Sequence, residues 1–178
     1  MNKVLSSRFK YVLGILIILL LILIAFREEP LSEKLHTDNI ESNVYAELWS
    51  RYREPKNNGD IYSSWHIYTI ENSIDSEAVQ ELIKTLESIP AKKRFFFPFE
   101  QVPVFNSNYD SLHIEFTTNG KTIHVTMLED FSTLYDSGSS PYKAYSVDLE
   151  AFEKIASVIE KYGEVEGITP KDTNDETK

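Results

Sequence analysis

Two histidines and one glutamate are the residues whose types and spacing best suit metal or proton chemistry. They are His113, Glu115 and His124, which lie within one short stretch of the chain. Imidazole nitrogens and carboxylate oxygens bind divalent transition metals, and imidazole also changes its charge near neutral pH. If the three side chains share one surface, they predict a metal site or a pH-responsive cluster.

A β-hairpin is the element that must position these side chains. Apolar and polar residues alternate over Leu112–Phe116 and again over Ile123–Met127. Between the two stretches lies Asn119-Gly120, the preferred pair for a two-residue type I′ turn. This turn pairs Thr118 with Lys121, so the numbers of any two facing residues sum to 239. The apolar pairs that the register then places on one face are Phe116 with Ile123, Ile114 with Val125, and Leu112 with Met127.

The same register gathers the polar residues on the opposite face. Glu115 stands directly across from His124, and His113 faces Thr126 and lies diagonal to His124. A zinc site needs three or four converging ligands, and the hairpin supplies three. The alternative is a solvated strand face on which Glu115 simply pairs with His124. We favour this alternative from the sequence alone, and no cofactor is assigned.

A basic and aromatic run is the second candidate site. Such residues can dock on an anionic bilayer, with the cations on the headgroups and the rings in the interface. The alternative is that the rings pack into the core from a short edge strand, which we favour because exposed phenylalanines promote aggregation. The residues are Lys92, Lys93, Arg94, Phe95, Phe96, Phe97 and Phe99.

Catalytic signatures are scarce in this sequence. It has no G-x-S-x-G elbow, no H-E-x-x-H pair and no phosphate-binding loop. It also has no cysteine, which excludes a thiol nucleophile, thiolate metal ligands and disulfides. The acids Glu129, Asp130 and Asp136 lie near one another in sequence, but acids flanking a turn are usually solvated. We therefore predict a protein that is not an enzyme.

The N-terminal region carries a long apolar run. Tyr11–Phe26 has no charged residue and follows a segment whose only charges are basic. Its 16 residues would form a helix of about 24 Å, and the flanking Lys10 and Arg27 can reach the headgroups on either side. We predict an uncleaved transmembrane helix with the N-terminus inside and the domain outside. The alternative is a cleaved signal peptide and a secreted domain, but only Ala25 suits a cleavage site.

Net charge restricts the classes of partner. The whole chain has a net charge of −10, and the part that follows the basic N-terminal segment has 15 basic against 28 acidic residues. Because nucleic-acid affinity comes largely from neutralising phosphates, we predict no nucleic-acid partner. The predicted partners are the membrane and a protein or other component of the cell surface.

The remaining pattern predicts one small α+β domain. Strand-like stretches precede and follow the hairpin, and apolar residues at helical spacing predict helices that end near Pro90 and Gly163. We expect an antiparallel sheet with the two helices packed on one face. The predicted organisation is a cytoplasmic basic segment at 1–10, a transmembrane helix at 11–26, a linker at 27–43, the extracytoplasmic domain at 44–163 and a disordered acidic tail at 164–178.

The order of these stretches resembles one group of bacterial domains. The chain reads LIKTLESIP, AKKR, SLHIEFTTNGKTIHVTML and then PYKAYSVDLEAFEKIASVIEKY. This layout is similar to the YhfM-like domains, which are small membrane-anchored or lipoprotein domains of Gram-positive bacteria with unknown function. The chain lacks the lipid-attachment cysteine of the lipoprotein members. The resemblance implies an extracytoplasmic location and an α+β fold, and it implies no activity.

Three functions follow from the sequence. The first is a non-enzymatic, membrane-anchored binding module of a Gram-positive cell envelope, a setting that a cysteine-free exported domain suits. The second is an envelope sensor of a ligand, a metal or pH that uses His113, Glu115 and His124. The third is a small envelope hydrolase.

Overall fold

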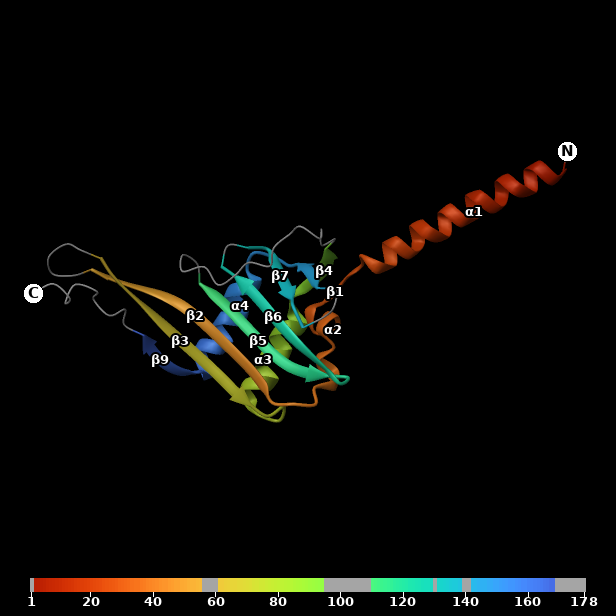
Figure 1. Cartoon of the computed structure of the whole chain (residues 1–178). Helices are drawn as coiled ribbons and strands as arrows, with labels where there is room; N and C mark the ends of the chain where they lie inside the picture. Colours follow the sequence, from red (N-terminus) through yellow and green to blue (C-terminus); the bar gives the residue numbers. More distant parts are fainter. Residues whose placement is uncertain (1, 56–60, 95–109, 130, 139–141, 169–178) are drawn as a thin grey trace, which may run out of the picture.

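The fold is an α+β domain with a helix that projects from it (Figure 1). The structure is a computed structural model that describes residues 2–55, 61–94, 110–129, 131–138 and 142–168. Within these residues the strands form a single nine-stranded antiparallel sheet. The predicted α+β class is therefore confirmed, as is the antiparallel sheet.

The elements follow one another in the order α1, β1, α2, a 3₁₀ turn at Thr37–Asn39, β2, β3, α3, β4 to β8, α4 and β9. The helices are α1 (Asn2–Ala25), α2 (Leu31–Leu35), α3 (Glu77–Ser88) and α4 (Ala151–Tyr162). The strands are β1 (Glu28–Pro30), β2 (Val44–Pro55), β3 (Ile61–Asn72), β4 (Pro90–Arg94), β5 (Ser111–Thr118), β6 (Lys121–Leu128), β7 (Thr133–Asp136), β8 (Lys143–Ser146) and β9 (Glu164–Ile168).

Helices α3 and α4 cover one face of the sheet, whose strand order is β1-β4-β8-β7-β6-β5-β2-β3-β9 (Figure 1). Alternation along each strand separates the two faces. In β5, Leu112, Ile114 and Phe116 are at most 2% exposed and pack in the core, whereas His113 and Glu115 between them are partly exposed. We call the face that carries these polar residues the open face.

The two covering helices form where the sequence predicts them. Helix α3 begins after Ser76, whose side chain accepts a hydrogen bond from the Val79 amide at 3.3 Å and so satisfies one free helix-end donor. The predicted apolar faces are buried, except that Ile83 in α3 is only partly so: Val79, Leu82 and Leu86 in α3, and Phe152, Ile155, Ala156 and Ile159 in α4.

Helix α1 projects away from the domain and is apolar on all sides from Tyr11 onward (Figure 1). The large apolar side chains that the structure describes on it, from Phe9 to Ile24, are each at least 46% exposed. In the described part of the chain, no helix combines the length and the hydropathy of a membrane span.

The segment at 27–43 is not the linker that the sequence predicts. It contains β1, which pairs with β4, and α2, in which Leu31 and Leu35 are at most 1% exposed. The amide of Leu31 also donates a hydrogen bond to the Ile89 carbonyl at 2.8 Å. The polar composition misled the prediction because two leucines four residues apart are enough to bury one face of a short helix.

The acidic tail is likewise not disordered throughout. Its first residues form β9, which pairs with β3 from Glu164 opposite Thr69 to Ile168 opposite Trp65. The side chains of β9 from Glu164 to Gly167 are exposed, so its strand pairing rests on backbone hydrogen bonds that composition does not reveal. The remainder of the tail, 169–178, lies outside the described residues.

Candidate metal centre

The β5–β6 hairpin has the predicted register. Asn119 and Gly120 have φ values of 50° and 67°, as both central residues of a type I′ turn require. Strand pairing runs from Thr118 opposite Lys121 outward, with Glu115 opposite His124 and His113 opposite Thr126. The structure therefore confirms the predicted placement of the three candidate ligands on one face.

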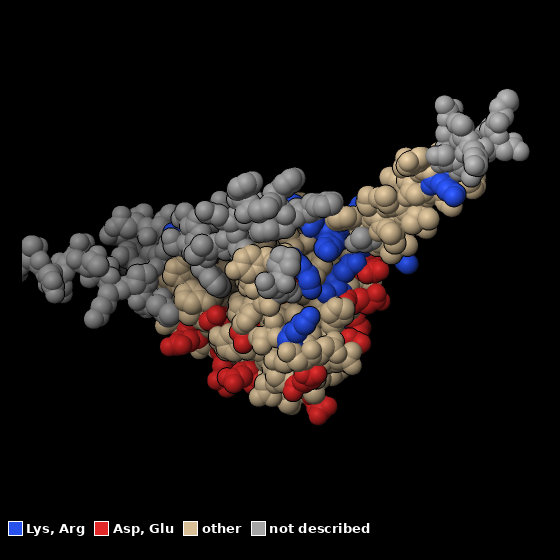
Figure 2. Space-filling view, turned by 45° about the vertical axis from the view of Figure 1, so that its right-hand side comes forward, with Lys and Arg blue, Asp and Glu red and all other residues tan. Residues whose placement is uncertain are grey.

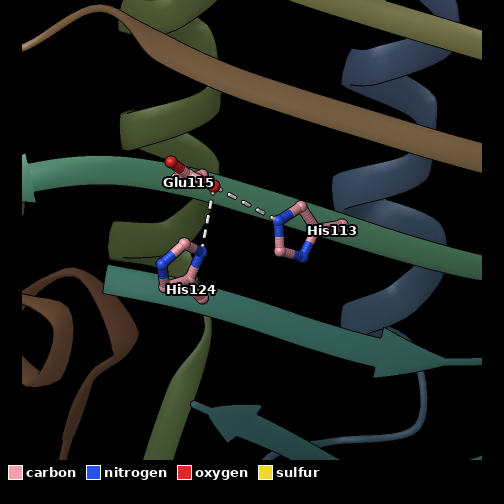
Figure 3. A group of neighbouring side chains, drawn as sticks. All are labelled: His113, Glu115 and His124. Atoms are coloured by element: carbon pink, nitrogen blue, oxygen red, sulfur yellow. Dashed lines mark ion pairs between the residues drawn. The ribbon is translucent and has the colours of Figure 1, made fainter. Parts of the chain in front are cut away.

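The three side chains converge on a single point (Figure 3). One carboxylate oxygen of Glu115, Oε2, lies 2.9 Å from Nδ1 of His124 and 3.8 Å from Nε2 of His113. The three ligand atoms all lie within 4.8 Å of one another. The two imidazole rings stack, with centroids 6.0 Å apart and planes at 25°. Protons on the imidazole nitrogens can be shared with the carboxylate oxygen between them, or a metal ion can bind to all three ligand atoms.

The cluster is reachable from solvent but is not fully solvated. The exposed fractions of the side chains are 20% for His113, 35% for His124 and 43% for Glu115. A hollow of about 330 Å³ adjoins Glu115 and is also lined by Tyr45 and Glu71. Because all three side chains are partly exposed, a small ion can reach them from solvent.

Strand β2 supplies the surroundings of His113. In the β2–β5 pairing Glu47 lies opposite His113 and Tyr45 lies opposite Glu115. The Tyr45 ring is tilted against the His113 ring, with centroids 6.4 Å apart. Burial, and then the nearby Glu47 carboxylate, raises the pKa of the Tyr45 hydroxyl above its usual value. The Glu47 carboxylate opposite His113 makes this side of the cluster more favourable for a cation than for an anion.

The second ring nitrogen of His113 has no partner in the structure. Its Nδ1 atom is buried, and among the described residues no group forms a hydrogen bond with it. An unpaired buried polar atom costs about 1–3 kcal/mol. Metal-ligating histidines usually donate their second N–H to a carboxylate or carbonyl, and Glu47 occupies the facing strand position. The orphaned nitrogen marks His113 as the least satisfied member of the cluster.

Gly138 contributes to the packing around His124, a role that the sequence did not reveal. A Cβ atom there would lie 2.2 Å from the Thr122 carbonyl oxygen and 2.9 Å from the His124 amide nitrogen. The preceding residue, Ser137, donates its amide hydrogen to the His124 carbonyl at 2.9 Å. The segment after β7 thus packs directly on the strand that carries His124. The Gly/Ser-rich stretch in the sequence was the available signal, but it indicated only a loop.

The geometry can be compared with that of a zinc site. Ligands about 2.0–2.1 Å from a tetrahedral zinc lie roughly 3.3 Å from one another. The separations of 2.9 and 3.8 Å from Glu115 to the two histidines lie on either side of this value. The two histidine nitrogens lie within 4.8 Å of each other, so side-chain rotations that draw them together would bring all three atoms to one ion. Three protein ligands leave a fourth position open for water or for a group from another molecule.

The other candidate residues do not join this cluster. Asp136 is 1% exposed, accepts a hydrogen bond from the Gly138 amide at 3.2 Å, and faces Val125 in the β6–β7 pairing. Asp130 lies outside the described residues.

The basic residues of the second candidate site lie on β4, and Lys92, Lys93 and Arg94 are exposed there. Arg94 donates a hydrogen bond from Nη1 to the Thr133 hydroxyl at 3.0 Å. Phe95, Phe96, Phe97 and Phe99 lie outside the described residues, so the choice between membrane contact and core packing stays a prediction.

Comparison with known proteins gives no relative from which a role could be transferred. No protein-family model, curated protein or solved structure matches this chain.

Proposed function

We propose that this protein is a membrane-anchored, extracytoplasmic module of the bacterial cell envelope that binds a divalent transition-metal ion on its open face. The observation that carries the proposal is the convergence of His113, Glu115 and His124, whose ligand atoms lie within 4.8 Å of one another. The sequence alone favoured a simple surface ion pair. The geometry favours a metal site, because two imidazole nitrogens and one carboxylate oxygen lie close together on one surface.

The ligand set favours zinc or a chemically similar ion. Imidazole nitrogens suit zinc, copper, nickel and iron, whereas calcium and magnesium prefer all-oxygen sites. With three ligands and partial exposure, the site would exchange its metal more readily than a closed four-ligand structural site. Because protons compete with metal for the imidazole nitrogens, metal binding would weaken in acid. These properties suit a sensor or a metal-dependent contact with a partner.

The anchor in this proposal is the apolar run Tyr11–Phe26. Helix α1 exposes apolar side chains in every direction, and a helix that is apolar all round needs an apolar environment. Lys10 and Arg27 flank the run and would lie at the headgroups on either side. The basic residues before the run favour an inside N-terminus, and the resemblance to YhfM-like domains supports an external domain.

We propose a binding role rather than catalysis. The sequence has no G-x-S-x-G elbow, no H-E-x-x-H pair and no phosphate-binding loop, and the cluster consists of metal-ligand residue types. The open fourth position could accept a ligand from a protein or cell-surface partner. The proposed role is thus still that of the interaction module predicted from the sequence, with metal binding assigned to its open face.

Calorimetric titration of the full-length protein in detergent with zinc tests the metal site. We expect one zinc per chain, and affinity at least roughly tenfold lower in His124→Ala and Glu115→Gln. Glu115→Gln keeps the shape of the side chain, which guards against a folding defect. The matched control is His66→Ala, because His66 faces Ser50 in the β2–β3 pairing, on the face opposite the cluster. Equal heats from wild type and both cluster variants would refute the site.

A further inference from the structure

We propose that a basic surface at the base of α1 lies on anionic lipid headgroups and fixes the orientation of the domain. We call this surface the basic edge, and it consists of Arg27, Lys92, Lys93 and Arg94, all of which are exposed. The inference rests on the proposed membrane anchor and adds to it the class of lipid contacted and the face that contacts it.

The connection between helix and domain is too short to act as a flexible tether. Helix α1 ends at Ala25 and β1 begins at Glu28, and three residue steps span at most about 11 Å. The Phe26 and Arg27 amides still donate hydrogen bonds to carbonyls of the last helical turn, at 3.1 and 3.2 Å. If α1 is embedded in a bilayer, the residues beside β1 must therefore lie close to the headgroups.

Strand pairing places β4 at that position. Strand β1 lies at the edge of the sheet beside β4, with Glu28 opposite Lys92 and Pro30 opposite Pro90. The basic residues of β4 are thus brought next to Arg27, although more than 60 residues separate them in the sequence. Figure 2 shows Lys and Arg side chains gathered next to the base of α1, with acidic side chains bordering them and spread over the rest of the visible face.

The two lysines of the basic edge are available to a ligand. Within the described residues, Lys92 and Lys93 form no ion pair or side-chain hydrogen bond. Arg94 donates a hydrogen bond to the neutral Thr133 hydroxyl. Of the nearby acids, Glu29 is paired with Lys34, and Glu28 is exposed opposite Lys92. The three exposed cations Arg27, Lys92 and Lys93 outnumber Glu28, the acid of β1 outside the Glu29–Lys34 pair, so this edge carries a net positive charge.

The acidic remainder of the domain favours one orientation of the domain on the membrane, with the basic edge toward the headgroups. The chain beyond the basic N-terminal segment has 15 basic and 28 acidic residues, so an anionic bilayer repels most of the domain. The basic edge, by contrast, would be attracted, over a range of about 8–10 Å at ordinary salt. The metal centre lies on β6 and β5, which are three and four strand positions from β4, or about 14 and 19 Å along the sheet. Docking would therefore hold the open face at a fixed height above the membrane.

A single introduced cysteine can report on this contact because the chain has no cysteine of its own. Ser146 is exposed and lies opposite Lys92 in the β4–β8 pairing, so Ser146→Cys places a fluorescent label on the basic edge. The matched control is Ser73→Cys, since Ser73 is also exposed but precedes α3, about one helix length, or 18 Å, from the start of β4. Both variants are made in the full-length protein and reconstituted in nanodiscs that contain a headgroup-located quencher lipid.

We expect quenching of the label at position 146 to be at least twofold greater in discs with phosphatidylglycerol than in discs of phosphatidylcholine alone. High salt, or Lys92→Gln with Lys93→Gln, should abolish the difference, and the label at position 73 should show none. Equal quenching at position 146 in both kinds of disc overturns the docking and leaves the anchor intact. Failure of the full-length chain to remain in the discs overturns the anchor, and the docking with it.

Discussion

Truncation of Leu35 tests whether the segment after α1 is part of the folded domain. The sequence predicts a polar spacer there, whereas the structure places Leu35 in the core with an exposed fraction of 1%. Its helix, α2, packs against α3 and lies beside β4, the strand that carries the basic edge. A Leu35→Ala variant removes part of this contact and leaves the charge of the segment unchanged.

The expected loss of stability is large. Removing the buried carbon atoms costs about 0.8 kcal/mol for each methylene-sized group, and the cavity left behind adds to this. Buried Leu→Ala substitutions cost about 2–5 kcal/mol in total. We expect about 3 kcal/mol, which shifts a urea midpoint by about 1.5 M if the m-value is about 2 kcal/mol/M.

Equilibrium unfolding of the full-length protein in detergent can measure this loss. Trp49 and Trp65 report on the sheet, since their rings meet edge to face with centroids 6.3 Å apart. The control is Leu149→Ala, at a side chain that is 72% exposed, which should change stability by less than about 0.5 kcal/mol. If Leu35→Ala changes the free energy of unfolding as little as Leu149→Ala does, the segment is a spacer after all.

Two further substitutions test the hairpin and the helix pair. Gly120→Ala should destabilise the fold by about 1–2 kcal/mol because φ at this position is 67°, and Gly167→Ala in β9, where φ is not positive, serves as its control in the same urea experiment. Hydrogen bonds from Lys161 and then Tyr162 lower the pKa of Glu81 in the folded state. The stabilisation of the fold by the ionised Glu81 is therefore complete above the usual glutamate pKa of 4.5 and is lost as pH falls through the lower folded-state value. Glu81→Gln should therefore flatten the acid limb of stability against pH, and an unchanged acid limb would show that this contact contributes nothing.

The local parts of the fold follow from sequence. The Asn119-Gly120 turn and the alternation on either side of it determine the hairpin register, and the structure confirms the predicted pairs. Both covering helices follow from apolar residues at helical spacing, because each face needs only local information. The position of the cluster could be predicted for the same reason, since the hairpin register alone places Glu115 opposite His124.

The non-local parts could not be predicted in this way. No pattern shows that β5 pairs with β2, or that β4 lies between β1 and β8, because strand order depends on the packing of the whole sheet. Strand β9 carries polar side chains and is held by its backbone, so composition indicated disorder. The register also leaves side-chain rotamers open. It therefore predicted that His113 and His124 are neighbours, but not that one oxygen of Glu115 lies between them.

The most direct test of the metal site is anomalous diffraction at the zinc absorption edge from crystals grown with zinc. The proposed site predicts a peak about 2.0–2.1 Å from Nε2 of His113, Nδ1 of His124 and a carboxylate oxygen of Glu115. A peak elsewhere on the domain, with Glu115 still bridging two metal-free histidines, would contradict the proposed site.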